Sequence, residues 1–204
     1  MIRPALAAIA VVAVGTAALW RGTDGGRAFT SEGARRLAVA RQPRIIPPVR
    51  LQDQDGRAFT LAELGGRPVA VDFIFTRCTT LCPVLGRTFA AVQRELPSSG
   101  TDGVPATPVL VSISIDPARD TPERLMEYAR MHGADPRRWR VARPLTDADR
   151  TALMAAFGIR VIPDGAGGFV HNGAVHLLDA RGRLVTIVDY DNPHAIAERV
   201  TAGS

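Results

Sequence analysis

Apolar and polar positions along the chain fall into blocks that predict strands and helices in turn. Residues 68–75 and 108–115 are near-continuous apolar runs of strand length, which is typical of strands buried on both faces of a sheet. Residues 81–96 repeat apolar side chains at helical spacing and follow directly on the first of these strands. A short strand is expected over residues 139–142, and a helix between Thr146 and Gly158.

The remaining blocks complete an alternating order of strands and helices. They are a β-hairpin over residues 49–60 with an Asp-Gly turn, a helix over 123–132, strands over 173–179 and 183–190, and a terminal helix over 193–200. Alternating buried strands and helices imply a parallel core, to which the last two strands add antiparallel pairing. We therefore predict an α/β protein, a thioredoxin-like three-layer α/β/α sandwich with an N-terminal β-hairpin.

The N-terminus carries a separate apolar run from Ala5 to Trp20. This run is short for a helix that spans a membrane, which needs roughly 20 residues. It suits the apolar part of a signal peptide or a short uncleaved anchor. We predict a signal peptide or membrane anchor over residues 1–21, a linker over 22–44, and the folded domain over 45–204.

Charge is distributed unevenly between these parts. The net charge is +5, and residues 1–44 contain seven arginines against two acids, whereas residues 45–204 contain 18 arginines and 18 acids. The folded part therefore has no excess of positive charge for a polyanion. An aromatic content of 5% also argues against a surface on which single-stranded nucleic acid would stack. Nucleic acid is not an expected partner.

The sequence has two cysteines, Cys78 and Cys82, placed where a buried strand ends and a helix begins. A disulfide across so small a loop would remove little chain entropy, so chemistry explains the pair better than a structural crosslink does. Residues four apart share one face of a helix, and the helix N-terminus lowers thiol pKa values. Two converging thiolates suit Cu(I) or zinc. The spacing does not forbid a disulfide, so thiol–disulfide exchange stays open.

Four histidines are candidates for a further ligand. His132 is expected at a helix end and His194 in solvent on the terminal helix. His171 follows a glycine-rich loop and enters the penultimate strand, which faces the cysteine turn in a thioredoxin-like fold. His176 lies five residues further along an extended chain and points the opposite way. His171 is therefore the histidine expected at the cysteines.

Several segments together carry a family resemblance. They are VDFIFTRCTTLCP over residues 71–83, VSISIDPARDTP over 111–122, Trp139 with AFGI over 156–159, and His171 eleven residues before Gly182. With these segments the chain resembles the Sco/SenC family of copper-binding proteins involved in cytochrome c oxidase assembly. The resemblance runs from about residue 45 to residue 190. It departs from the family at Thr79 and Thr80, where a proline and an acid are usual.

The resemblance implies one copper ion held by Cys78, Cys82 and His171. Cu(I) would need mainly the thiolates, whereas Cu(II) would recruit the imidazole as well. The first aspartate of the Asp-Pro-x-x-Asp-Thr-Pro motif is Asp116, which would lie beside the ligands without binding the metal. A turn residue that closes the strand is the alternative role for Asp116, and Arg119 with Asp120 could form a local charge pair.

The expected function is that of a copper metallochaperone, a carrier rather than an enzyme. It would work on the periplasmic side of a bacterial inner membrane, anchored or secreted, with other periplasmic copper carriers and the copper-bearing subunit of cytochrome c oxidase as partners. The alternative is a thiol–disulfide reductase that keeps the oxidase cysteines reduced, with Cys78 attacking and Cys82 resolving. A third possibility is redox or copper sensing.

Overall fold

The chain of the computed structural model divides into two compact units, Met1–Gln42 and Pro43–Ser204. The structure describes residues 2–78, 80–97, 107–165 and 167–203, so Thr79 lies outside the described part. The first unit contains helices α1 (Ile2–Gly22) and α2 (Ser31–Arg41). None of the helices in the described residues combines the length and the apolarity that crossing a membrane requires.

Helix α2 forms inside the segment that the sequence predicted as an irregular linker. Thr30 caps its N-terminus, where the side-chain oxygen accepts the backbone N–H of Gly33 at 3.0 Å. Glu32 pairs with Arg35 at 2.6 Å and with Arg36 at 3.1 Å on the same helix. Ion pairs three and four residues apart support a helix that has little apolar periodicity, and this is why the pattern of apolar residues missed it.

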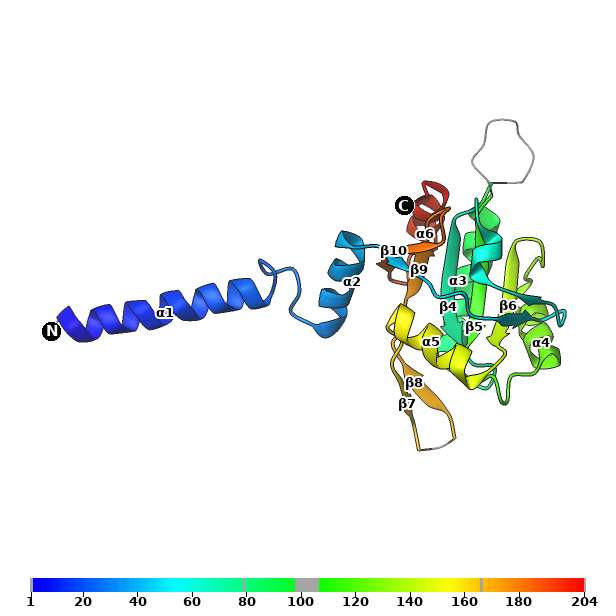
Figure 1. Ribbon diagram of the computed structural model, residues 1–204, viewed down its shortest axis with the longest axis horizontal. Coiled ribbons are helices and arrows are strands. Elements are labelled where there is room, and N and C mark those ends of the chain that lie inside the picture. Colours follow the sequence, from blue (N-terminus) through cyan, green and yellow to red (C-terminus); the bar gives the residue numbers. More distant parts are fainter. Residues whose placement is uncertain (1, 79, 98–106, 166, 204) are drawn as a thin grey trace. The chain divides into compact units, whose positions relative to one another are not determined.

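The second unit is built on an eight-stranded sheet, as far as the described residues show (Figure 1). The order across the sheet is β1-β10-β9-β4-β5-β6-β2-β3, with β4, β5 and β6 parallel and the other pairs antiparallel. The strands are β1 (Arg44–Ile45), β2 (Leu51–Asp53), β3 (Ala58–Phe59), β4 (Val69–Ile74), β5 (Val109–Ser114), β6 (Trp139–Pro144), β9 (Val175–Leu178) and β10 (Arg183–Val188).

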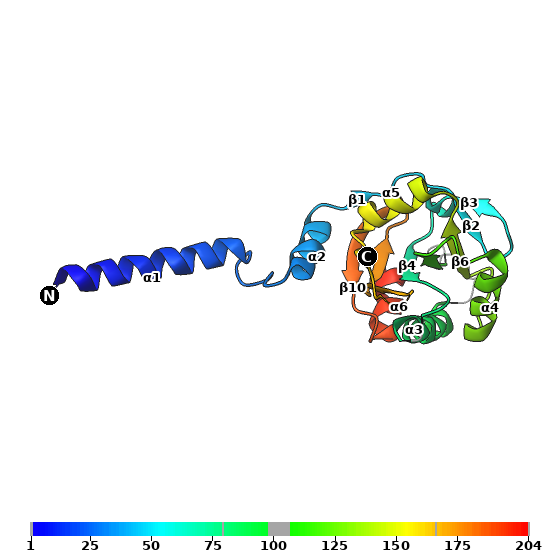
Figure 2. The same cartoon turned by 90° about the horizontal axis from the view of Figure 1, so that it is seen from below.

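Helices cover both faces of this sheet (Figure 2). They are α3 (Leu81–Glu95), α4 (Pro122–His132), α5 (Asp147–Phe157) and α6 (Pro193–Thr201), with a short 3₁₀ turn, η1, over Leu61–Leu64. Helices α3, α4 and α6 lie on one face and α5 lies on the other. Successive right-handed crossovers in one direction place α3 and α4 together, and the return of the chain from β6 to β9 places α5 opposite. The predicted mixed α/β architecture is confirmed.

The central strand β4 separates the two halves of the core. Phe73 points toward α5 and meets Phe157 edge-on, with ring centroids 5.2 Å apart. Neighbouring residues of a strand face opposite sides, so Asp72 points toward α3 and α4. On that side Phe89 of α3 packs against Trp139 at 5.7 Å. Burying a side chain of this size contributes about 1.5–3 kcal/mol, so these rings anchor both helix layers to the sheet.

A second, two-stranded sheet differs from the sequence prediction. The sequence predicted a glycine-rich loop over residues 165–168 but no strands beside it, whereas the chain there forms a hairpin of β7 (Val161–Pro163) and β8 (Phe169–His171). Its register pairs Val161 with His171. Strands of three residues carry too little alternation to be recognised in a sequence. The hairpin matters because His171 is its last residue.

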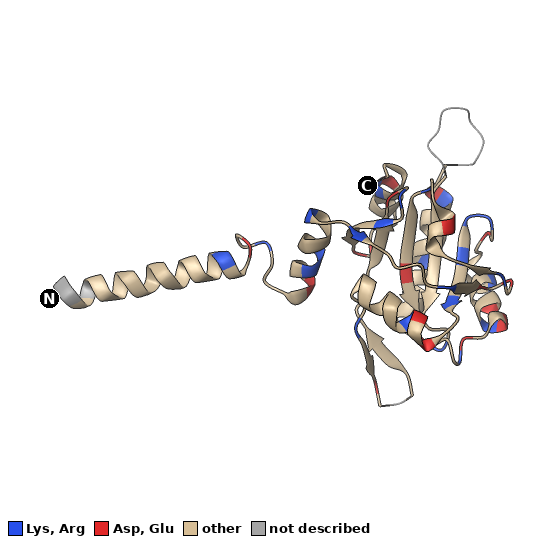
Figure 3. Cartoon of the chain, viewed as in Figure 1, with Lys and Arg blue, Asp and Glu red and all other residues tan. Residues whose placement is uncertain are grey.

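Acidic and basic residues are interspersed along the ribbon of the second unit (Figure 3). This agrees with the equal numbers of arginines and acids in residues 45–204. The chemistry at the cysteine turn is therefore governed by local charges and hydrogen bonds and not by a strong field from the whole domain.

Candidate metal centre

The two cysteines lie in the turn that joins β4 to α3. The backbone N–H of Cys78 donates to Phe75 at 3.1 Å, which closes the turn. The backbone N–H of Cys82 donates to Sγ of Cys78 at 3.4 Å. Thr80, the residue before the helix, makes no side-chain capping bond. The sulfur of Cys78 therefore takes the place of a capping oxygen at the N-terminus of α3.

The turn shifts the pKa values of the two thiols in opposite directions. Burial alone would raise the pKa of Cys78, but hydrogen bonds from the backbone and side chains of Cys82 and Thr80 outweigh it and hold the pKa below its ordinary value. Burial raises the pKa of Cys82 far above the ordinary range, although the N–H of Phe75 donates to its sulfur at 3.4 Å. Both cysteines are free thiols, Cys78 half-buried and Cys82 buried. The pair thus combines a half-buried thiol with a lowered pKa and a buried thiol with a raised pKa.

A buried carboxyl group lies on the same side of the sheet. Asp72 is fully buried opposite Ser112, and neither of its oxygens has a hydrogen-bond partner in the described structure. Burial raises the pKa of Asp72 to about 7, which the nearby Ser112 hydroxyl only partly offsets. The charge of Asp72 in turn helps to raise the pKa of Cys82. Sequence reasoning missed Asp72 because it stands alone within an apolar run.

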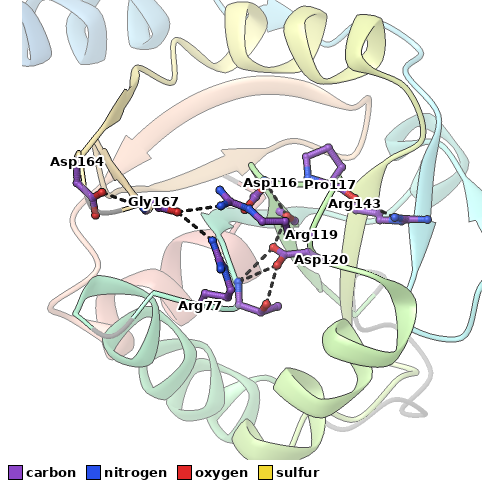
Figure 4. Close-up of polar contacts among 11 residues, drawn as sticks. Arg77, Asp116, Pro117, Arg119, Asp120, Arg143, Asp164 and Gly167 are labelled. Carbon is purple, nitrogen blue, oxygen red and sulfur yellow. Dashed lines mark hydrogen bonds and ion pairs between the residues drawn. The ribbon is translucent and has the colours of Figure 1, made fainter.

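Asp120 ties the cysteine turn to the loop that follows β5. Its carboxylate accepts the backbone N–H of Thr76 at 3.2 Å and the Thr76 hydroxyl at 2.6 Å, and it accepts Oγ of Ser114 at 2.5 Å (Figure 4). Asp120 is completely buried, so this network replaces its hydration. The expected pairing of Arg119 with Asp120 is wrong. Arg119 instead donates to the carboxylate of Asp116 at 2.5 Å.

The two aspartates of the Asp-Pro-x-x-Asp-Thr-Pro motif therefore have roles that differ from the prediction. Asp120 orders the turn two residues before Cys78, whereas Asp116 is 7% exposed and holds Arg119. The sequence signal for Asp120 was its place just after β5, whose end lies beside the end of the parallel strand β4. That Asp116 supports the metal ligands remains a prediction.

His171 ends strand β8 and is 8% exposed. Neither of its ring nitrogens has a hydrogen-bond partner in the described structure. Burial lowers its pKa, and the nearby backbone of Asn172 only partly offsets the effect, so the ring is neutral at physiological pH. Burying ring nitrogens without hydrogen-bond partners costs free energy, which binding to a ligand would offset. Neutral imidazole is also the form that binds metals.

Phe75 contacts both His171 and the cysteine pair. Its backbone N–H bonds to the sulfur of Cys82, and its ring meets the His171 ring at 6.4 Å between centroids. The chain just after His171 also approaches the cysteine helix, since a Cβ on Gly173 would lie 2.7 Å from the side chain of Leu81. A larger residue at position 173 would require the end of the Leu81 side chain to shift.

The structure thus brings Cys78 and Cys82 together, and Phe75 links them to His171 through its contacts with Cys82 and with the imidazole ring. In the described residues, no group of three or more His, Cys, Asp or Glu side chains is close enough to hold a metal ion. The donor types fit copper, because two thiols and an unpaired buried imidazole are soft and borderline ligands. Binding by all three would require the imidazole to move toward the sulfurs.

The other histidines lie away from the thiols or are otherwise engaged. His176 is buried between the rings of Phe73 and Phe157, at 5.5 and 5.3 Å. His194 is exposed and pairs with Glu95 at 2.8 Å, which raises its pKa. His132 packs on Tyr128 at 4.5 Å, and burial lowers its pKa. His132 shares a cavity of about 300 Å³ with Cys78.

Comparison with known proteins gives consistent results. The family model described as SCO1/SenC matches residues 38–202. The SCO1 protein homolog of Bacillus subtilis is 26% identical over 142 residues, which cover 69% of this chain and 71% of the relative. A putative copper-binding protein of Stutzerimonas stutzeri is 35% identical over 85 residues, covering 42% of this chain and only 40% of the relative.

Among solved structures, ScoI of Bradyrhizobium japonicum with copper bound superposes with a TM-score of 0.64. The two are 26% identical, and the match covers 78% of this chain and 99% of the other. The mixed α/β fold of the second unit is therefore the thioredoxin-like fold of Sco proteins. The predicted anchor over residues 1–21 lies outside the residues that the family model matches and remains a prediction.

The buried carboxyl group generates a prediction about pH. Asp72 has a folded-state pKa near 7, above its ordinary value of 3.8, so the unfolded chain releases this proton first as the pH rises. The contribution of protonated Asp72 to the free energy of unfolding is fully present below about pH 4 and is lost as the pH rises through 7. Asp72→Asn cannot ionise, so its free energy of unfolding relative to wild type should be greater at pH 8 than at pH 4 by about 4 kcal/mol.

Urea unfolding of the full chain at the two pH values measures this difference. Asp147→Asn is the control, because Asp147 is almost fully exposed. If Asp72→Asn and wild type change in parallel between pH 4 and pH 8, the folded-state pKa assigned to Asp72 is wrong.

The thiol acidities generate a prediction about alkylation. Because hydrogen bonds stabilise the Cys78 thiolate, the midpoint of its rate of reaction with iodoacetamide against pH should lie below the midpoint for the urea-unfolded chain. Cys82 is 1% exposed and has a raised pKa, so it should react far more slowly. Mass spectrometry of peptides resolves the two sites. Equal rates at Cys78 and Cys82 in the folded chain would contradict the assignment.

Proposed function

The chain belongs to the SCO1/SenC family, and we propose that it binds one copper ion through Cys78, Cys82 and His171 and delivers it to a cytochrome c oxidase. Copper is the cargo in this proposal and the acceptor is the copper-bearing subunit. The observation that carries the proposal is the pair of adjacent thiols, together with a buried imidazole that contacts Phe75 of the same turn and whose nitrogens have no partner in the described structure. A relative named as copper-binding and a related structure with copper bound support the choice of metal.

The protonation states of the three groups suit stepwise binding. The lowered pKa of Cys78 makes its thiolate easier to form than that of Cys82, which must lose a proton when copper binds. Binding therefore releases a proton and strengthens as the pH rises. Two thiolates satisfy Cu(I), and the neutral His171 ring adds the nitrogen that Cu(II) prefers. The same chain can thus hold either oxidation state with different numbers of ligands.

The unequal exposure of the sulfurs suits transfer by ligand exchange. Cys78 lines two cavities, one of about 300 Å³ beside α4 and one of about 440 Å³ beneath the β7–β8 hairpin. A thiolate of the acceptor can reach copper from the side of Cys78 while Cys82 still holds the metal. Transfer then needs no covalent bond to be made or broken within a substrate.

The proposal includes an extracytoplasmic location. Residues 1–21 would act as a signal peptide or membrane anchor and residues 22–44 as a spacer before the copper-binding domain. The domain would then work at the periplasmic side of a bacterial inner membrane, where other copper carriers could load it. The balanced charge of residues 45–204 supports protein partners rather than nucleic acid.

Thiol–disulfide reduction is the second candidate, and the unequal thiol acidities favour it. The Cys78 thiolate would attack a disulfide between the acceptor's copper-site cysteines and form a mixed disulfide, releasing one acceptor thiolate. Cys82 would then lose its proton and displace the second acceptor sulfur. The products are a Cys78–Cys82 disulfide and a reduced acceptor, with two electrons transferred. His171 has no part in this reaction.

His171 therefore distinguishes the two functions in cells. In a strain that lacks the native gene, we expect Cys78→Ser, Cys82→Ser and His171→Ala each to fail to restore copper in the oxidase, because all three are ligands of the transferred copper. His194→Ala is the matched control and should restore it, since the His194 side chain is exposed on α6. The measurements are oxidase activity and the optical signature of its copper centre.

A different pattern would favour the reductase. If His171→Ala restores the oxidase fully while either cysteine substitution abolishes it, disulfide reduction and not copper carriage is the function. Restoration by both cysteine variants would exclude the two functions together.

A further inference from the structure

Two arginines bind the tip of the hairpin that carries His171. Nη2 of Arg77 and Nη1 of Arg119 each donate to the carbonyl oxygen of Gly167 at 2.9 Å. Figure 4 shows the two guanidinium groups converging on Gly167 from the cysteine turn and from the loop after β5. We call these two side chains and the Gly167 carbonyl the arginine clasp. Nothing in the copper-ligand set accounts for it.

Arg119 is itself held in place. Its Nε donates to Asp116, and its guanidinium lies 5.3 Å from the ring centroid of Phe169 in β8. The Phe169 ring in turn meets Phe75 edge-on at 5.6 Å. A planar guanidinium can bind a carboxylate, a carbonyl and an aromatic face at once, which a lysine ammonium cannot do. Arg119 therefore links the aspartate motif to two points of the hairpin.

The base of the hairpin is anchored independently. Oδ1 of Asn172 accepts the backbone N–H of Arg160 at 2.8 Å, and its Nδ2 donates to Gly158 at 3.2 Å. On the outer face, by contrast, Ile162 and Val170 are 62% and 61% exposed. Little apolar burial therefore holds the hairpin down from that side. Its position over the cysteine turn depends on Phe169 and on the arginine clasp.

We propose that Arg119 and Arg77 are positioning residues for His171, because the arginine clasp keeps the hairpin over the cavity beside Cys78. This cavity of about 440 Å³ is lined by Phe75, Arg77, Cys78, Phe169 and other residues of the two turns. A docked hairpin leaves the imidazole only a short movement to join the thiolates. A free hairpin would have to be ordered when the metal binds, and that ordering would weaken the nitrogen bond.

This inference rests on the proposed function and adds to it a separate requirement for Cu(II). The test loads the purified full-length chain with Cu(II) or Cu(I) and compares wild type with Arg119→Gln, Arg77→Gln and His171→Ala. Affinities are measured by competition with chelators, and nitrogen coordination by the hyperfine pattern in electron paramagnetic resonance. Arg119→Gln should lose about tenfold in Cu(II) affinity and weaken the nitrogen signal, as residues that orient metal ligands commonly do. Its Cu(I) affinity, which rests on the thiolates, should equal that of wild type.

The matched control is Arg143→Gln. Arg143 supports the same loop by donating to Pro117 at 2.9 Å, and its other hydrogen bonds in the described structure go to Gln52 and not to the hairpin. It should bind Cu(II) as wild type does. Phe169→Leu is a second variant that keeps both arginines but loses the aromatic contacts, and it should show a smaller loss of Cu(II) affinity. Circular dichroism confirms folding of each variant.

The outcomes separate this inference from the proposed function. Arg119→Gln with the Cu(II) affinity and nitrogen signal of wild type, in an experiment where His171→Ala loses both, overturns the arginine clasp. Equal losses in Arg119→Gln and Arg143→Gln also overturn it, because general support of the loop would then explain the effect. If His171→Ala itself matches wild type, the proposed ligand set fails, and the clasp fails with it.

Discussion

The hydrogen bond from the N–H of Cys82 to the sulfur of Cys78 is the contact on which the site depends. It places one sulfur at the positive end of α3 and the other within the first turn of the helix. The bond can form only if the turn leaves β4 in a fixed direction, and Asp120 fixes that direction by holding Thr76. The Asp120 carboxylate, the turn and the helix therefore form one unit. This unit determines the pKa values of both thiols before any metal binds.

The state of the His171 imidazole depends on burial without hydrogen bonds. His171 is desolvated and its nitrogens have no partner in the described structure, so it is held in a state that a ligand would relieve. Phe75 contacts both groups, His171 through its ring and the sulfur of Cys82 through its backbone N–H. A two-ligand state and a three-ligand state would then differ by the movement of the imidazole toward the sulfurs. This suits a carrier that must bind its cargo and also release it.

The sequence was most informative where a long pattern and a chemical motif coincide. The apolar run of β4 followed by the helical spacing of α3 was enough to place Cys78 and Cys82 at a strand-to-helix turn. The sequence could not show that Asp120 rather than Asp116 supports this turn, because both follow the same strand and the choice depends on side-chain direction. The hairpin of β7 and β8 was missed because three-residue strands show no period. For the same reason the sequence could not show how His171 lies relative to the thiols. Helix α2 was missed because ion pairs and a cap, not an apolar face, support it.

X-ray absorption at the copper edge tests the central claim most directly, because it identifies the atoms bound to the metal. In the full-length chain loaded with one equivalent of Cu(II), the account predicts two sulfur neighbours and an imidazole nitrogen, and replacement of His171 by alanine should remove the imidazole contribution while both sulfurs remain. A spectrum with no sulfur neighbours, or one that the His171 substitution leaves unchanged, would contradict the account.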